Sequence, residues 1–268
     1  MSEERLDFTG VADDDVTWTL LGTLYLRAWE SGAPRPILGD HHAAEAIRRI
    51  DYDFAKLHRR VRPEANQYLV ALRATQFDDW AVDFLRRHPD AVVLHLGCGL
   101  DSRALRLVPP STVDWFDLDQ PEVIELRRKL YPEREHYRLI GSSVTDPSWL
   151  AGIPADRPAL VIAEGLLPYL GEAEVRQLLQ RLVTHFGSGE LHFDAGARWL
   201  AKLSPLGAWG LRDAREVERW HPRLRCLEEV AFTARYARIP SPAYRRLYQV
   251  MNAIPFCRNI FREYRFSF

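Results

Sequence analysis

The glycines Gly97 and Gly99 are the first feature of this sequence that could do chemistry. They follow an apolar run, Val92–Leu96, which predicts a strand that ends in a glycine turn. Glycine has no Cβ atom and adopts positive φ angles, so its backbone amides can approach a ligand closely. A dinucleotide-binding turn has a third glycine where this chain has Ser102. Asp101 suits an ammonium group better than a pyrophosphate, so the turn predicts a loop for a cationic or zwitterionic ligand.

Two further acids follow predicted strands at the same edge of the sheet. Asp119 lies twenty residues after Gly99, where an acid can bind the two hydroxyls of a ribose. Asp117 lies on the same strand face and competes for that role. Glu164 follows the apolar run of PALVIAEG. A ligand with a ribose, an amino group and no phosphate is indicated, and S-adenosylmethionine fits all three conditions.

Methyl transfer from a sulfonium mainly requires alignment of the acceptor oxygen and exclusion of water. A carboxylate acceptor needs no general base, whereas a hydroxyl acceptor benefits from one. Asp194 and Tyr169 are the candidates for this catalytic side. Alternatively, Asp194 caps the next helix and Tyr169 packs structurally. His192 and His95, both inside predicted strands, are interpreted as buried structural histidines.

The elements that must position these residues form two blocks. Helical patterns fill the first block, at 16–30, 42–50 and 63–87. Strand patterns follow at 92–96, 113–118, 137–140, 160–163 and 191–193, with helical patterns between them at 102–107, 122–130 and 172–186. This alternation predicts an α/β fold with a mainly parallel, Rossmann-like sheet.

The last part of the chain departs from that alternation. Residues 224–236 and the aromatic FREYRFSF end predict two strands that add an antiparallel edge to the sheet, with the latter placed at its edge. We expect a helical N-terminal cap at 1–89 and a core at 90–268. An insertion near 197–222 is expected to act as a lid. Its tryptophans are candidates to line an apolar acceptor pocket: Trp199, Trp209 and Trp220.

Composition limits the partners. The net charge of −1 argues against nucleic acid, because no basic surplus is available for a phosphate backbone. The three cysteines lack metal-site spacing, so no metal site or disulfide framework is expected. With no signal-peptide pattern and no long apolar run, the sequence predicts a cytoplasmic protein without a membrane span. Its oligomeric state stays open.

Several motifs in the same order resemble the leucine carboxyl methyltransferase family. The branch most similar is the bacterial one that includes the tetracenomycin-type polyketide O-methyltransferases. The resemblance rests on ESGAPRPILGDHHA, IDYDF, RATQFDDW, VVLHLGCGLDSR, WFDLDQPEVIELRR and AEGLLPYL. It implies a class I methyltransferase fold with a helical N-terminal cap, and S-adenosylmethionine as the methyl donor.

The same resemblance implies roles for individual residues. Arg73 would hold the carboxylate of the donor, and Glu164 would lie near its amino group. The adenine-binding positions correspond to Ser143 and Val144 in GSSVTD, which departs from the Asp-Leu pair often found there. A second departure is Asp40-His41, where the family often has Asp-Pro.

These features together predict an S-adenosylmethionine-dependent O-methyltransferase. Its acceptor would be a carboxylate or phenolic hydroxyl of a small aromatic or polyketide-like metabolite. Two alternatives remain at this point. One is a nicotinamide-dependent dehydrogenase, which the residue at position 102 disfavours. The other is a catalytically silent domain that binds the donor.

Overall fold

The computed structural model describes residues 5–8, 15–201 and 209–268. Among them, seven strands form one sheet in the order β5-β4-β3-β6-β7-β9-β8. The strands are β3 (Val92–Leu96), β4 (Asp114–Asp119), β5 (Tyr137–Gly141), β6 (Ala159–Ala163), β7 (Gly189–Gly196), β8 (Arg225–Ala231) and β9 (Phe261–Ser267). The first five are parallel, and β9 runs antiparallel to both β7 and β8. The predicted α/β class, with its antiparallel edge, is confirmed.

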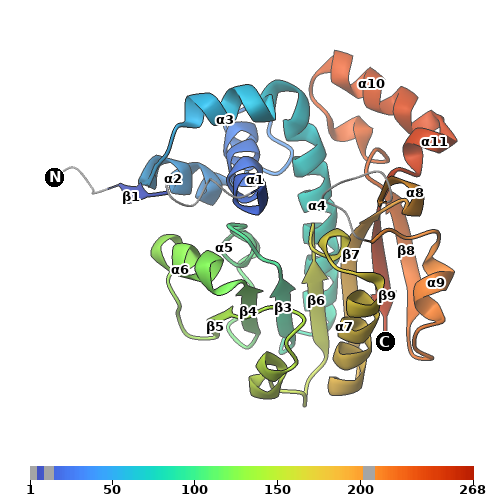
Figure 1. The fold of residues 1–268 in the computed structure, drawn as a ribbon. Coiled ribbons are helices and arrows are strands. Elements are labelled where there is room, and N and C mark those ends of the chain that lie inside the picture. The colour runs from blue at the N-terminus through green and yellow to red at the C-terminus, as the bar shows by residue number, and fades with distance from the viewer. Residues whose placement is uncertain (1–4, 9–14, 202–208) are drawn as a thin grey trace.

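The chain begins this sheet in the middle. It runs outward from β3 to β5, then returns to place β6 on the other side of β3. That reversal makes β3 and β6 the switch point, and ligands of open α/β sheets bind beyond the carboxyl ends of the strands at such a point. Figure 1 shows three helices of the N-terminal region above those ends: α1 (Asp15–Ser31), α2 (His41–Arg49) and α3 (Phe54–Val61). The fourth, α4 (Pro63–Arg87), runs from this layer along one face of the sheet.

Local sequence signals explain where these helices begin. The side chain of Asp40 accepts from the amide of Ala43 at the start of α2, and Asp53 accepts from Lys56 at the start of α3. α4 opens with Pro63 at its first position, as the sequence predicts, because proline lacks the amide that would be unpaired there. The sequence analysis did not predict α3. A two-stranded ladder of β1 (Leu6–Asp7) and β2 (Ile50–Asp51) completes this region.

The remaining helices cover the sheet and its far end: α5 (Arg103–Leu107), α6 (Pro121–Leu130), α7 (Glu172–His185), α8 (Arg198–Ala201), α9 (Ala214–Glu218), α10 (Pro242–Ala253) and α11 (Pro255–Arg258). Successive residues of β6 face opposite layers of the core. Leu160 and Ile162 pack with Phe77 of α4, whereas Val161 packs with Leu179 of α7. β6 is therefore buried on both faces, as its unbroken apolar run predicts.

One expectation about the last third of the chain was wrong. The FREYRFSF strand, β9, is an interior strand between β7 and β8, and β8 forms the edge. Its rings Tyr264 and Phe266 stack on Phe193, with centroids 5.3 and 5.6 Å apart, because both strands turn these side chains into the same core. Trp209 is buried in that core, and Trp220 packs against it.

The expected lid is only partly described. Residues 202–208 of the 197–222 segment lie outside the described residues. Trp199 is exposed and stacks on Phe256, with ring centroids 5.0 Å apart. No helix among the described residues is long and apolar enough to cross a membrane.

Candidate active site

The glycine turn after β3 has the backbone that its sequence predicts. Gly97 and Gly99 have φ angles of +61° and +51°. A Cβ atom on Gly97 would lie 2.9 Å from Cδ1 of Leu166, so the turn packs against the segment after β6 only if this residue is glycine. Between them, Cys98 donates its amide to the carbonyl of Leu118 at 3.2 Å. Burial raises the pKa of the Cys98 thiol, which fits a small neutral residue rather than a nucleophile.

Asp119 and Asp117 have different surroundings although they share a strand face. Asp117 is fully buried and accepts from Nε of Arg127 at 2.9 Å, from the Trp115 indole at 2.8 Å and from the Tyr137 hydroxyl at 2.5 Å. Burial alone would raise the pKa of Asp117, but Arg127 holds it well below its usual range. Asp117 is therefore a structural carboxylate: the protein's own donors occupy its oxygens, and no part of it is accessible to a ribose.

Asp119 ends β4 beside the glycine turn. Its Oδ2 accepts from the Gly99 amide at 2.7 Å, and its Oδ1 accepts from the Gln120 amide at 2.8 Å. Neither partner is charged, and burial raises the pKa of this carboxyl. Each carboxylate oxygen has a second lone pair free to accept from a ligand hydroxyl.

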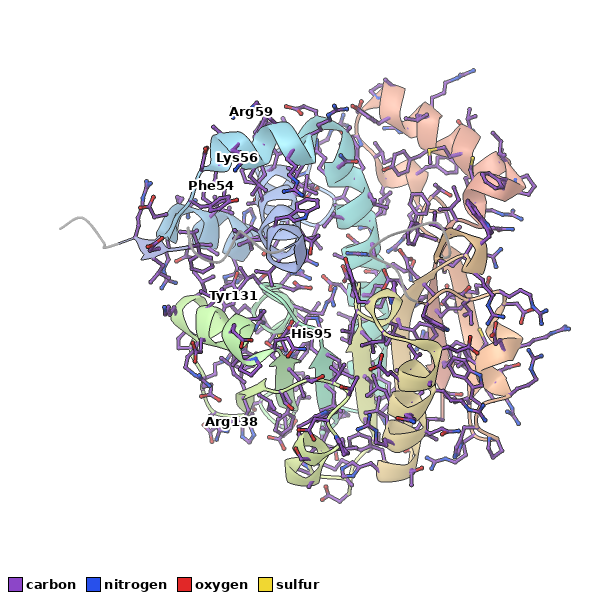
Figure 2. The ribbon with its side chains drawn as sticks, viewed as in Figure 1. Phe54, Lys56, Arg59, His95, Tyr131 and Arg138 are labelled. Carbon is purple, nitrogen blue, oxygen red and sulfur yellow. The ribbon has the colours of Figure 1, made fainter. Side chains whose placement is uncertain are left out.

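His95 lies on β3 below the helical cap, where Figure 2 labels it. Its Nδ1 is 3.2 Å from Oδ1 of Asp117, and its Nε2 is 3.4 Å from Nη1 of Arg103. Tyr131, also labelled in Figure 2, follows α6 and donates to the carbonyl of Leu100 at 3.4 Å. Both side chains contact residues at the end of the strands and of the glycine turn, which agrees with a structural interpretation of His95.

Glu164 is the centre of a buried cluster of arginines. Nε of Arg73 lies 3.0 Å and Nη2 of Arg27 lies 3.2 Å from its Oε1, and Arg103 donates to its Oε2. Burial alone would raise the pKa of Glu164, but the guanidiniums of Arg103, Arg73 and Arg27 lower it to about 2. Arg103 has no exposed surface and also donates to Oδ1 of Asp78 at 2.8 Å.

Asp101 extends the cluster toward the glycine turn. Its Oδ1 accepts from Nη1 of Arg106 at 3.1 Å, and its Oδ2 lies 3.2 Å from Arg27 and 3.4 Å from Arg103. No geometrically sound hydrogen bond to Oδ2 is formed within the described part of the chain. Burial opposes its ionisation, yet these arginines hold the pKa of Asp101 well below its usual range. A buried oxygen of this kind can accept from an ammonium group, the role that the sequence predicts.

The charges of this cluster fit a cationic ligand. Its buried carboxylates outnumber its guanidiniums: Asp40, Asp78, Asp101, Glu164 and Asp194 face Arg27, Arg73, Arg103 and Arg106. An uncompensated negative charge in a desolvated site favours a positively charged partner. S-adenosylmethionine meets this condition, since its sulfonium and ammonium groups exceed its single carboxylate.

Asp194 lies inside β7, two residues before its end, and does not cap a helix. Its Oδ2 accepts from Nη1 of Arg73 at 3.0 Å, and its Oδ1 accepts from the Gly165 amide at 2.6 Å. Burial raises the pKa of Asp194, although Arg73 opposes the shift. The structure thus joins Arg73, Asp194 and Glu164, which come from α4, β7 and the segment after β6.

The other expected site residues lie around this centre. Ser143 hydrogen-bonds through its hydroxyl to that of Thr145 at 2.8 Å, and Val144 is buried in the core beside Trp149. Tyr169 ends a short 3₁₀ turn, η3 (Leu167–Tyr169), with 45% of its surface exposed. Its hydroxyl is not among the groups that contact Glu164 or Asp194, so no acceptor role follows from its position.

Sequence reasoning missed several members of the cluster. Arg27 lies in the otherwise apolar stretch LYLRAW, and a lone arginine there was a signal that it is buried with an acid. Arg103 and Asp78 stand inside motifs that carry the family resemblance but have no assigned role there. Glu263 was missed because it looks like an ordinary polar position of an alternating strand.

A small pocket opens beside Arg73 and Asp194. It encloses about 340 Å³, counting space open to solvent. Its lining residues come from α4, β7, β9 and the position directly after β8: Leu69, Arg73, Asp194, Phe232, Phe261, Arg262 and Glu263. Polar groups of the site and apolar rings therefore meet in one cavity.

Comparison with known proteins identifies the family. A family model described as leucine carboxyl methyltransferase matches residues 20–183. The chain belongs to this family. Members similar to it include the tetracenomycin polyketide synthesis O-methyltransferase TcmP of Streptomyces glaucescens, 48% identical over 236 residues, with 84% of each chain covered. The S-adenosyl-L-methionine-dependent methyltransferase dpfgK of Gibberella zeae is 36% identical over 268 residues, with 89% of this chain and 90% of that protein covered.

A solved structure agrees with the fold. A methyltransferase described as putative, from Thermobifida fusca, superimposes with a TM-score of 0.57 over 90% of this chain and 93% of that one, at 15% identity. As a member of the leucine carboxyl methyltransferase family, this chain is an S-adenosylmethionine-dependent methyltransferase. The dehydrogenase alternative finds no support among these relatives.

Proposed function

We propose that this enzyme transfers the methyl group of S-adenosylmethionine to an oxygen atom of a small polyketide-like acceptor, as a carboxylate ester or a phenol ether. The identity of 48% with a relative named as a polyketide O-methyltransferase, over most of both chains, is the observation that carries this proposal. The buried negative surplus around Glu164 supports it, because it suits a cationic donor.

The donor would supply a methyl group on a positively charged sulfur, ready for in-line displacement. We assign binding of its ribose hydroxyls to Asp119. The backbone of Gly97 and Gly99 would pack closely against the donor. Glu164 and Asp101 would accept from its amino group. Arg73 would pair with its carboxylate in a charge-assisted contact.

The adenine end of the donor lies farther along the sheet edge in this proposal. Ser143 and Val144 follow β5, next to Asp119 in the sheet, because Ser142 donates its amide to the carbonyl of Asp119 at 2.9 Å. The buried side chain of Val144 leaves its neighbour's hydroxyl and the loop backbone as the groups that would meet the ring.

The residues of the chain would act mainly by orienting the two substrates and by excluding water from the site. Asp194 has both oxygens engaged, by Arg73 and by the Gly165 amide, so we assign it to orienting Arg73 rather than to removing a proton. Tyr169 stays a candidate for the acceptor side. We propose that the 1–89 cap shields the donor and that the 197–222 segment covers the acceptor, so that water is excluded during displacement.

An acceptor screen tests the proposal. The purified protein is incubated with methyl-labelled S-adenosylmethionine and a panel of aromatic carboxylic acids and phenols, and products are analysed by mass spectrometry. We expect a gain of one methyl group on oxygen in at least one aromatic member. Donor binding without a methylated product in any class would indicate a silent donor-binding domain, and methylation on nitrogen or carbon alone would contradict the assignment to oxygen.

A further inference from the structure

Glu263 of β9 is a buried glutamate without a visible partner. Only 2% of its surface is exposed. Neither of its carboxylate oxygens has a hydrogen-bond partner among the residues that the structure describes. A buried, unpaired polar group costs free energy, so a native protein that keeps one usually uses it. Glu263 also lines the pocket beside Arg73, so its buried carboxyl group lies next to a cavity.

The sheet register places Glu263 directly across from Asp194. Two neighbouring carboxyl groups in a desolvated site do not both ionise readily, so one of them keeps its proton. Asp194 has a guanidinium and a backbone amide on its oxygens, and both donors favour its ionised form. Glu263 has neither, so the shared proton belongs on Glu263.

The charged groups around Glu263 agree with this distribution. Burial raises the pKa of Glu263 well above its usual range, and the neighbouring Asp194 and Glu164 raise it further. Arg73 and Arg235 act in the opposite direction without reversing the shift. These surroundings therefore favour the carboxylic acid form of the side chain, which has an O–H group to donate.

Besides Glu263, Asp194 and the guanidiniums of Arg73 and Arg262, the lining of the pocket is apolar and aromatic. Leu69, Phe232 and Phe261 line it, and the two phenylalanine rings meet edge to face with centroids 6.4 Å apart. Apolar walls beside the carboxyl group of Glu263 suit a flat ring that carries an oxygen. The same cavity reaches Asp194 and Arg73, so a ring bound there would lie next to the proposed donor site.

We propose that this pocket binds an aromatic ring of the methyl acceptor, and that the protonated carboxyl group of Glu263 donates a hydrogen bond to an oxygen on that ring. The inference rests on the proposed function, which it extends by naming the acceptor-binding residue and the class of acceptor: an aromatic acid or carbonyl compound. Glu263 acts here as a neutral donor and not as a general base, because an ionised Glu263 would face an ionised Asp194 without a cation bound to it.

Two substitutions test this role. Glu263→Gln keeps the shape and a hydrogen-bond donor but cannot lose a proton, whereas Glu263→Leu removes the donor. The probe is 3-hydroxy-2-naphthoate, titrated by fluorescence into the full chain, so that binding is measured without methyl transfer. Leu247→Ala, on the exposed face of α10, serves as the surface control.

We expect the wild-type protein and the Gln variant to bind this probe with similar affinity at pH 7. The Leu variant should bind about tenfold more weakly, which corresponds to one lost hydrogen bond. Wild-type affinity should fall as the pH is raised through the pKa of Glu263, because an ionised Glu263 repels the anionic probe. The Gln variant should show no such fall.

Steady-state kinetics with any acceptor found in the screen can contradict the proposed role of Glu263. If Glu263 were a general base, Glu263→Gln would lower kcat and leave the acceptor KM unchanged, and the proposal would be overturned. Equal probe affinity in the Leu variant and the wild type would also overturn it. If no acceptor is methylated, the proposed function fails, while the probe titration still decides whether the pocket binds an aromatic acid.

Stability gives a readout that needs no ligand. A carboxyl group with a raised pKa in the folded state stabilises the fold at pH values below its unfolded pKa, and that contribution is lost as the pH rises through the folded pKa. The unfolding free energy of the wild type should therefore decline relative to that of Glu263→Gln as the pH rises above about 4.5. Parallel curves over this range would show that Glu263 is ionised in the fold and would contradict the proposal.

Discussion

Two buried glutamates lie on the same face of the sheet, beneath the same helix, and differ in their partners. Glu190, near the start of β7, accepts from Arg87 at 2.6 Å and from Arg265 at 2.7 Å, and Nε2 of His192 lies 2.9 Å from it. Glu263, near the other end of that face, has no hydrogen-bond partner among the described residues. Exposure is 4% for the first and 2% for the second.

The directions of their pKa shifts differ although both side chains have almost no surface exposed to solvent. Burial would raise the pKa of Glu190, but its hydrogen bonds from His192, Arg265 and Arg87 lower it to about 2. The pKa of Glu263 stays well above the usual range. Burial alone therefore does not decide which acid is structural. The number of hydrogen-bond donors to the carboxylate oxygens decides it. The acid without such donors is the one whose oxygens can bind a ligand.

The largest effect on the free energy of unfolding is expected at Arg103, whose buried guanidinium pairs with two buried carboxylates. Arg103→Met leaves Glu164 and Asp78 without their shared buried guanidinium. We expect a loss of about 3–5 kcal/mol in the free energy of unfolding, since removing one partner strands buried charges. Urea denaturation at pH 7 measures it.

The matched control is Arg128→Met, an arginine whose side chain is half exposed and lies 3.7 Å from Glu133. Its loss should cost less than about 1 kcal/mol, because solvent screens such pairs. Equal losses for Arg103→Met and Arg128→Met would mean that the Glu164 cluster is not closed as described.

Glu190→Gln is expected to have the next largest effect. It should reduce stability at pH 7 by about 2 kcal/mol, because two guanidiniums lose a charged acceptor. The folded pKa of Glu190 lies below its ordinary value, so its contribution is present above about pH 4.5. It is lost as the pH falls toward 2. Denaturation curves of the variant and the wild type should therefore converge over that range, and a constant gap would contradict the comparison.

The last effect concerns ligand affinity rather than stability, and it is expected at the carboxyl end of β4. Asp119→Ala should weaken binding of S-adenosylmethionine by about 1–3 kcal/mol, since the ribose hydroxyls would lose their acceptor. Isothermal titration calorimetry measures the affinity. Asp114→Ala, at the opposite end of the same strand, is the control and should leave the affinity unchanged. Full affinity in the Asp119 variant would move ribose binding to another residue.

Local patterns explain most of what could be predicted from this sequence. The limits of α4 and the place of the glycine turn follow from proline, glycine and apolar periodicity, which act within a few residues of the chain. Asp119 could be identified for the same reason, because the end of a strand is visible as the end of an apolar run. β9 was misplaced because alternation describes a half-buried strand wherever it lies in a sheet.

Only part of the cluster around Glu164 could be predicted from the sequence. Arg73 and Glu164 were identified from motifs, but their contact across 91 positions of the chain was not. Arg27 and Arg103 had no predicted role, because an arginine in a helical pattern is ordinarily exposed and only its neighbours in space show that it is buried.

The sequence by itself determined the class of fold, the glycine turn and the acids at the strand ends, because short-range backbone and hydrophobic preferences encode them. Only the tertiary structure decided which acids keep their protons. That choice depends on hydrogen-bond donors from distant elements. Arg127 donates to Asp117 and Arg73 donates to Asp194, whereas no described residue donates to Glu263. Charge compensation is a property of three-dimensional neighbours, and two identical side chains on one sheet face can therefore have opposite ionisation.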